Sequence, residues 1–202
     1  MKKTKKILAL ALAAVMLMCT TVAATVAYLQ DDDAVTNTFT VGNVTITLDE
    51  ADVKTDGTYE STVDKRVEEN KYHLIPGHSY IKDPIVHVDD DSENCYLFVK
   101  LENGLKDIID DTTIENQMIA NGWSLVDGKT NIYIHEDIAE GGDDVDVFAT
   151  FKLKTDANVA SYVNAEGKVE AKIVVTAYAI QADGFDATKT ADMSKMLTAL
   201  GL

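Results

Sequence analysis

The chain has 202 residues, of which 46% are apolar, and it carries 34 acidic against 18 basic side chains. That length suits a single domain with one full hydrophobic core. The formal net charge of −16 repels phosphate backbones and anionic lipid, so the composition argues against nucleic-acid binding and against membrane attachment by charge. It favours solubility, association with cations or a basic partner.

The N-terminal segment predicts export. Its basic residues are Lys2, Lys3, Lys5 and Lys6, and the apolar stretch behind them ends in the small residues of 22–27, as a secretory signal peptide does. We predict cleavage between Ala27 and Tyr28, with a cut after Ala24 as the alternative. An uncleaved anchor is the competing interpretation, because residues 7–29 are long enough to span a bilayer. In either case the Lys cluster places the rest of the chain outside the cytoplasm.

We therefore expect residues 1–27 to be a signal peptide and residues 28–202 to form one domain. This domain would be secreted, and either extracellular or associated with the cell surface. After cleavage it would hold 14 basic and 34 acidic groups, because the segment removed contains four lysines and no acid.

A strand pattern follows the acidic residues 31–33. Apolar side chains alternate with threonine and asparagine over residues 39–48, and Gly42-Asn43 interrupts the alternation, which indicates a bulge or a kink. The apolar members are Phe39, Val41, Val44, Ile46 and Leu48. Near a new N-terminus, such a strand can pair with its own fold or with a neighbour. Residues 28–48 are thus the predicted linker and candidate donor strand.

Short strands and turns fill the middle of the chain. Residues 49–69 are interpreted as an acidic loop with at most a short hairpin, and Pro76-Gly77 is a strong turn signal. Alternation resumes over 81–88, where Pro84 indicates an edge strand or a strand start. Residues 95–102 form the clearest buried strand.

The second half of the chain adds helices to the pattern. A helix capped by Thr112 or Thr113 is predicted to run through Ala120, and a hairpin is predicted over 123–134. Two longer strands are predicted over 145–153 and 169–180, a helical turn over 159–163, and a C-terminal helix within 187–202. Many short strands and little helix predict a mainly β, antiparallel sandwich with one or two short helices and the C-terminal helix.

No catalytic motif is recognisable in the sequence, and we do not expect an enzyme. The four histidines, His73, His78, His87 and His135, lack the spacing of a metal-binding pair and are interpreted as polar surface residues. Cys95 is alone in the exported part, which excludes an intramolecular disulfide there. It is interpreted as a small buried hydrophobe.

Three acidic clusters offer oxygen ligands of the kind that calcium prefers. The weak candidates among them are Asp89, Asp91, Asp143 and Asp144. None has the spacing of an EF-hand loop, so solvated charge is the favoured interpretation. No cofactor is expected, although calcium remains open.

Several motifs together resemble the TasA/camelysin family of exported Gram-positive proteins. The signal region ending Ala-Thr-Val-Ala-Tyr-Leu is followed by aspartates and by the run from Phe39 to Leu48. The segment Leu74-Ile-Pro-Gly-His-Ser-Tyr-Ile-Lys-Asp83 resembles the family's proline–glycine turn, and the strands at 96–101 and 173–181 stand where the family has core strands. The likeness covers most of the chain in order.

The resemblance implies a jelly-roll-like β sandwich and a secreted subunit of biofilm matrix fibres. Its partners would be other copies of itself and, during export, a SipW-type signal peptidase. In such fibres the N-terminal strand of one subunit completes the sheet of the next, which places the donor on residues 28–48. A monomeric surface-binding or adhesion module is the alternative. A camelysin-like metal-dependent protease is a further, less favoured alternative, because the chain has no zinc-binding motif to support it.

Overall fold

The computed structural model describes residues 40–41, 43–59, 65–162 and 171–202. These residues all belong to one compact unit within 35–202. The predicted signal peptide and its cleavage site, Ala27 and Tyr28, lie outside the described residues, as does Phe39. In the part of the chain that is described, no helix combines the length and the apolar character needed to cross a bilayer.

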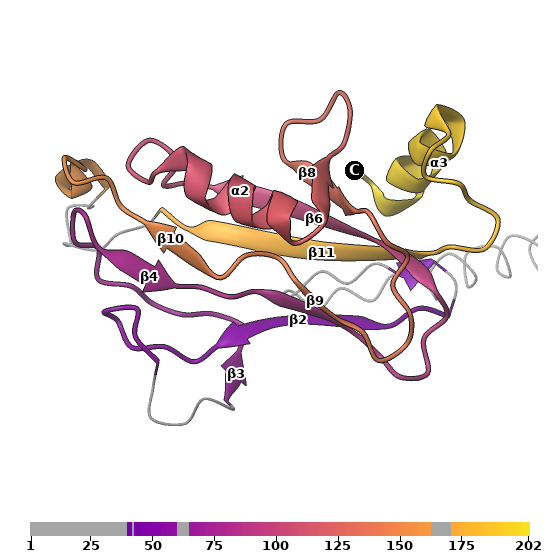
Figure 1. The fold of residues 1–202 in the computed structure, drawn as a ribbon, viewed down its shortest axis with the longest axis horizontal. Helices are drawn as coiled ribbons and strands as arrows, with labels where there is room; N and C mark the ends of the chain where they lie inside the picture. The colour runs from indigo at the N-terminus through magenta and orange to yellow at the C-terminus, as the bar shows by residue number, and fades with distance from the viewer. Residues whose placement is uncertain (1–39, 42, 60–64, 163–170) are drawn as a thin grey trace, which may run out of the picture. The chain divides into compact units, whose positions relative to one another are not determined.

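A five-stranded sheet forms one layer (Figure 1). Its strands, in spatial order, are β1 (Thr40–Val41), β11 (Ile173–Gln181), β6 (Cys95–Asn103), β8 (Ile132–His135) and β7 (Trp123–Leu125). β11 and β6 pair antiparallel along their whole length, from Ile173 opposite Asn103 to Gln181 opposite Cys95. β1 is parallel to β11, whereas the other neighbours in this sheet are antiparallel.

Two smaller sheets face this layer. The four-stranded sheet has the order β3 (Arg66–Val67), β2 (Ile46–Ala51), β5 (Ile85–Val88) and β9 (Asp144–Asp146). The two-stranded sheet pairs β10 (Thr150–Lys152) with β4 (Ser79–Ile81). All pairings in both sheets are antiparallel.

The main core lies between these layers. Alternation along each strand turns one set of side chains inward, so Leu97 and Val99 of β6 meet Ile46 of β2 and Val86 of β5 in one apolar cluster. The helix α2 (Asp111–Ala120) closes this core, because its Ile114 and Met118 are buried there.

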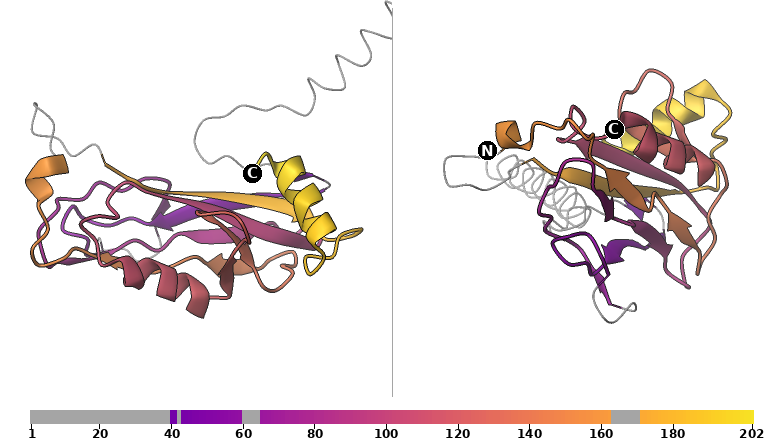
Figure 2. Two further views of the ribbon diagram at one scale, coloured as in Figure 1. Left: turned by 90° about the horizontal axis from the view of Figure 1, so that it is seen from above. Right: turned by 60° about the vertical axis from the view of Figure 1, so that its left-hand side comes forward.

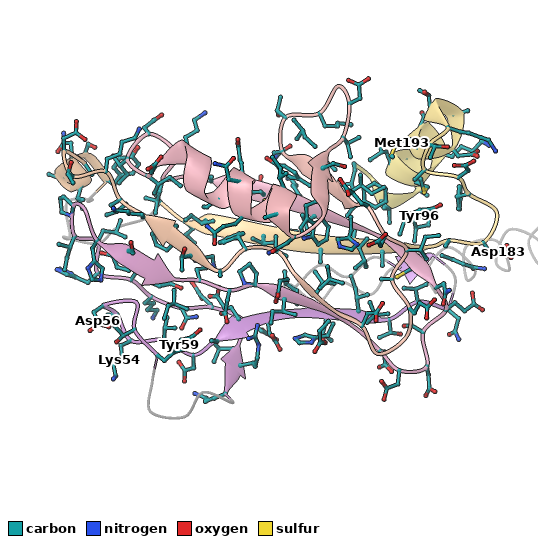
Figure 3. All side chains as sticks on the ribbon, viewed as in Figure 1. Lys54, Asp56, Tyr59, Tyr96, Asp183 and Met193 are labelled. Atoms are coloured by element: carbon teal, nitrogen blue, oxygen red, sulfur yellow. The ribbon has the colours of Figure 1, made fainter. Side chains whose placement is uncertain are left out.

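The C-terminal helix α3 (Thr190–Leu200) packs on the other face of the five-stranded sheet. It buries Met196, Leu197 and Leu200 against a second cluster that includes Phe98 and Ile180. Figure 2 shows α3 at the end of β11, and Figure 3 labels Met193 and Tyr96 in this region. The helix therefore forms a third layer over part of the sheet.

The predicted fold class is confirmed: the domain is a mainly β sandwich with two described α-helices, one of them C-terminal. The short helical turn is present as the 3-10 helix Val159–Tyr162. The Pro76-Gly77 turn and the strands predicted at 81–88, 95–102, 123–126 and 131–134 are also found, with ends shifted by a few residues.

Three details of the prediction are wrong. The run predicted as one strand over 145–153 is two strands in two sheets, β9 and β10, with Val147 and Phe148 buried between them. The supposed loop beginning at Asp49 starts instead with the end of β2. The cap of α2 is Asp110, not a threonine, and its side chain makes no capping bond. In each case tertiary packing decided where an element ends.

Candidate functional site

The predicted donor segment divides between two sheets. Thr40 and Val41 form β1 and pair with Ala179 and Ile180 of β11 in the five-stranded sheet. Ile46 begins β2 and pairs with Val88 of β5 in the four-stranded sheet. The chain therefore passes from one layer to the other between Val41 and Ile46.

The two halves of this segment differ in how firmly they are held. Val44 and Ile46 are each 2% exposed and belong to the main core, and Leu48 packs against it. β2 also has pairing partners on both sides, β3 and β5. β1, in contrast, has two residue pairs with one neighbour within the described part of the chain. The core thus anchors the chain from Val44 onward, and much less pairing holds Thr40–Val41.

β11 extends far beyond the two residues that β1 covers. Among the described residues, Ile173–Ala177 have a strand neighbour on the β6 side only. Val174 is 40% exposed, and Ile173 and Val175 are partly buried against the main core. This stretch has the properties of a strand acceptor: a backbone edge bordered by apolar side chains.

Charged side chains lie on both edge strands of the four-stranded sheet, β3 and β9. On β3, the Arg66 side chain bonds Asp49 (Nε to Oδ1, 2.5 Å) and donates to the main-chain oxygen of Asp83 at 3.0 Å. On β9, a three-residue strand, Asp144 and Asp146 are both exposed acids. Short, charged edge strands disfavour further strand addition, so the β11 edge is the better acceptor.

One histidine joins three strands of that sheet on its outer face. His87 on β5 lies between two carboxylates: Nδ1 is 2.5 Å from Asp144 Oδ1 on β9, and Nε2 is 2.9 Å from Asp49 Oδ1 on β2. Burial lowers the pKa of His87, but its bonds to the two carboxylates outweigh burial, and the pKa is raised above its usual value. The sequence had suggested only a polar surface histidine.

Three of the four weak calcium candidates, Asp89, Asp143 and Asp144, have hydrogen-bond partners for their carboxylates. Asp89 Oδ1 accepts from the main-chain N–H of Asp91 at 3.3 Å, and Asp143 Oδ2 accepts from that of Glu140 at 2.8 Å. Asp144 faces His87. Over the described ranges, no group of three or more His, Cys, Asp or Glu side chains is placed to hold a metal ion.

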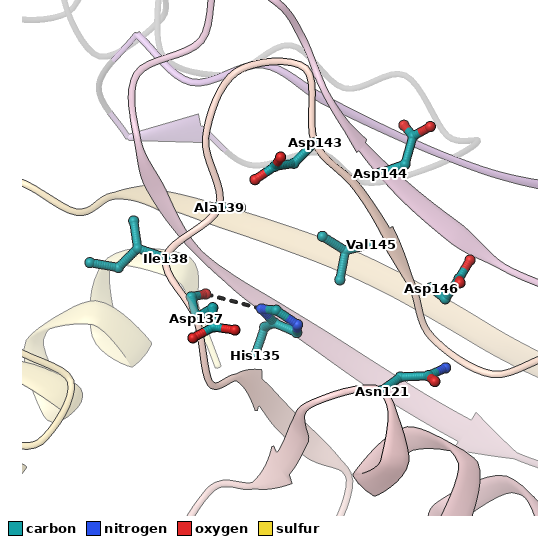
Figure 4. A pocket seen from close by; sticks show the side chains of 9 residues that line it. All are labelled: Asn121, His135, Asp137, Ile138, Ala139, Asp143, Asp144, Val145 and Asp146. Carbon is teal, nitrogen blue, oxygen red and sulfur yellow. Dashed lines mark hydrogen bonds between the residues drawn. The ribbon is translucent and has the colours of Figure 1, made fainter.

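A shallow hollow of about 320 Å³ lies beside two of these aspartates (Figure 4). Its lining includes Asp143, Asp144, Asp146 and His135, whose Nδ1 is 3.0 Å from the main-chain oxygen of Asp137. The carboxylates line different parts of its wall and do not converge on one point. The hollow therefore has the character of a solvated acidic surface.

A buried polar cluster escaped the sequence analysis. Glu50, which is 3% exposed, bonds both Lys82 and Asn70 from the core side of β2. One signal for it was available: Glu50 has the same parity as Ile46 and Leu48 in the strand alternation, and a charged residue at an apolar position of a strand needs a partner.

No protein-family model matches this chain, and neither the curated proteins nor the solved structures contain a match to it.

Proposed function

We propose that this protein is an exported structural subunit, which assembles into extracellular fibres by passing its N-terminal strand to a neighbouring copy. The observation that carries the proposal is the contrast at β11. Its edge is covered by two residues of β1, while Ile173–Ala177 have no strand on that side among the described residues.

The short β1 pairing favours exchange on energetic grounds. The two residue pairs described for β1 supply few hydrogen bonds, so their loss in one subunit would cost little. A longer strand laid along β11 would gain main-chain bonds to the edge. Its side chains would cover Val174 on one face and the partly buried Ile173 and Val175 on the other.

The boundary of the exchanged segment follows from burial. Residues up to Val41 would leave, and the chain from Val44 onward would stay, because Val44 and Ile46 are fixed in the subunit's own core. The donor would then include Phe39 and Val41, whereas Val44, Ile46 and Leu48 would act as its anchor. A contact of this head-to-tail kind does not close on itself and propagates a filament.

Export and processing complete the proposal. Removal of residues 1–27 by a signal peptidase would free the segment that begins at Tyr28. An N-terminus still inserted in a membrane could not reach a neighbour. This is the behaviour that the resemblance to the TasA/camelysin family suggests.

Engineered cysteines test the exchange directly. The pair Thr40→Cys and Ala179→Cys places thiols at register partners of β1 and β11, close enough for a disulfide; Cys95→Ala removes the native thiol. The matched control joins Lys100→Cys on β6 to Thr176→Cys on β11, two partners that stay within one subunit.

We expect electron microscopy of the mature chain to show fibres. Oxidised fibres of the test pair should give a ladder of covalent oligomers under denaturing electrophoresis, and the control pair only monomers. Fibres whose test pair cross-links solely within monomers would contradict strand exchange. A mature chain that remains monomeric at all concentrations would contradict the fibre itself and favour the surface-binding module.

A further inference from the structure

The carboxylate of Glu50 bridges two side chains, an amine and a primary amide, that can react with each other. Its Oε2 lies 2.5 Å from the Lys82 ammonium Nζ. Its Oε1 lies 2.9 Å from the Asn70 amide Nδ2 and 3.1 Å from the Asn70 main-chain nitrogen. One buried acid thus holds an amine and a primary amide on its two oxygens.

The Asn70 amide is fixed in one orientation by main-chain groups. Its Oδ1 accepts a bond from the N–H of Val53 at 3.0 Å, and its Nδ2 donates to the carbonyl of Ala51 at 2.8 Å. The Val53 N–H therefore polarises the carbonyl and is already in position to stabilise negative charge on Oδ1. Glu50 is in position to deliver a proton to Nδ2.

Two members of the cluster, Glu50 and Lys82, are largely shielded from water, and Asn70 is partly buried. The side chains of Glu50 and Lys82 are 4% and 12% exposed, and Val53 and Ala51 are buried beside them. The nearby Tyr72 has a raised pKa, chiefly because it is buried and secondarily because of the charge on Glu50. In such surroundings, passing a proton from the ammonium to the carboxylate removes two buried charges and leaves a neutral, nucleophilic amine.

We propose that Lys82 and Asn70 form an intramolecular isopeptide bond, with Glu50 as the catalytic residue. The inference rests on this cluster alone and is independent of fibre assembly. Its reactants are all in the folded chain, so the bond would form as a consequence of folding.

The steps balance without any added reagent. Lys82 passes one proton to Glu50 Oε2, and its neutral Nζ then attacks Asn70 Cγ, placing negative charge on Oδ1 against the Val53 N–H. The tetrahedral centre collapses as the Cγ–Nδ2 bond breaks. Glu50 relays a proton from Nζ to the leaving nitrogen, and ammonia departs. Ammonia takes up the remaining proton as ammonium, and Glu50 is again a carboxylate.

The bond would tie the segment after β3 to the end of β4. Residues 65–70 contact β2 and the residue after it through polar groups; the Lys65 ammonium, for example, donates to Asp52 Oδ2 at 2.6 Å. β3 pairs over only two residues. The only described cysteine is unpaired. A lysine–asparagine bond would give this region a covalent cross-link of the kind that a disulfide supplies elsewhere.

Peptide mapping of the folded, full-length exported chain tests the proposal. After denaturation, trypsin cleaves an unmodified chain behind Arg66, Lys71, Lys82 and Lys100. We expect instead one branched product, in which the peptide 67–71 is joined to 72–100 without cleavage at Lys82. Its mass should equal the summed masses of the peptides 67–71 and 72–100 minus the mass of one ammonia. Recovery of the unmodified peptides 67–71 and 72–82 from the folded protein would overturn the inference.

Variants separate this chemistry from other losses of ammonia. Glu50→Gln retains both reacting groups and should give linear peptides, as should Lys82→Arg. Lys172→Arg alters an exposed ion pair with Glu69 and should keep the branched product. Asn103-Gly104 and Asn121-Gly122 can lose ammonia by cyclisation, but neither change lies in the peptides monitored. If Glu50→Gln fails to fold, the wild-type map and the Lys172→Arg control decide the question.

Discussion

Val41 and Ile46 lie close in sequence but in different sheets: Val41 pairs in parallel with Ile180, and Ile46 pairs antiparallel with Val88. The chain between them crosses the sandwich. This crossing separates a lightly held end from an anchored strand, and it sets the expected effects of changes on either side.

A change after the crossing should mainly lower stability, whereas a change before it should mainly prevent assembly. Ile46→Ala removes a side chain that is 2% exposed and should lower the free energy of unfolding by about 3 kcal/mol. Deletion of residues 28–38 should leave the unfolding midpoint nearly unchanged and abolish fibres. Denaturant unfolding and electron microscopy measure the two effects. Fibres that persist after the deletion would argue against the donor segment.

The row Asp49–His87–Asp144 should make stability depend on pH. An imidazole can donate to both carboxylates only when both ring nitrogens carry protons. Since the pKa of His87 is raised in the folded state, its contribution is complete below the unfolded value of about 6.5 and is lost as pH rises through the folded value. Arg66 also faces Asp49, from β3.

We expect His87→Gln to lower stability by about 1 kcal/mol at pH 5 and to have little effect at pH 9, given the partial exposure of the groups. His73→Gln, at an exposed position, is the matched control and should leave the pH profile intact. Urea unfolding across this range measures both. An unchanged profile in His87→Gln would show that the imidazole is not protonated between its carboxylates.

Two glycines with the same backbone angle should respond differently to alanine. Gly57 and Gly128 have φ values of 76° and 75°, so a side chain strains both by about 1 kcal/mol. At Gly57 the added Cβ would also lie 2.6 Å from Tyr80 Cδ1 and 2.8 Å from Tyr80 Cα, whereas Gly128 has open space. Gly57→Ala should therefore cost about 2 kcal/mol more than Gly128→Ala. Equal thermal midpoints would contradict this packing.

Cys95 should be unreactive in the native protein. It is fully buried, and burial, together with the charge of Asp143, raises the pKa of its thiol to about 11. Because the thiolate is the nucleophile, a thiol-specific reagent at neutral pH should label it only after unfolding. Fast labelling of the folded chain would mean that β6 opens locally.

The features that could be predicted from the sequence are those that depend on residues close together along the chain. The strand at Cys95–Asn103 and the helix at Asp111–Ala120 follow from local periodicity, and the structure has both close to the predicted bounds. Local pattern failed at 145–153, where alternation continued through a change of sheet. The alternation predicts which side chains point inward, but it does not predict to which sheet the strand belongs.

The sequence by itself determined the acidic charge, the alternation of inward and outward side chains, and the lone cysteine of the described domain. Only the tertiary structure decided that Thr40–Val41 and Ile46–Ala51 belong to different sheets, that His87 joins Asp49 to Asp144, and that Glu50, Asn70 and Lys82 share one hydrogen-bonded site. The physical reason is the same in each case. These contacts join residues far apart along the chain, and their geometry is fixed by how the sheets pack rather than by any local spacing.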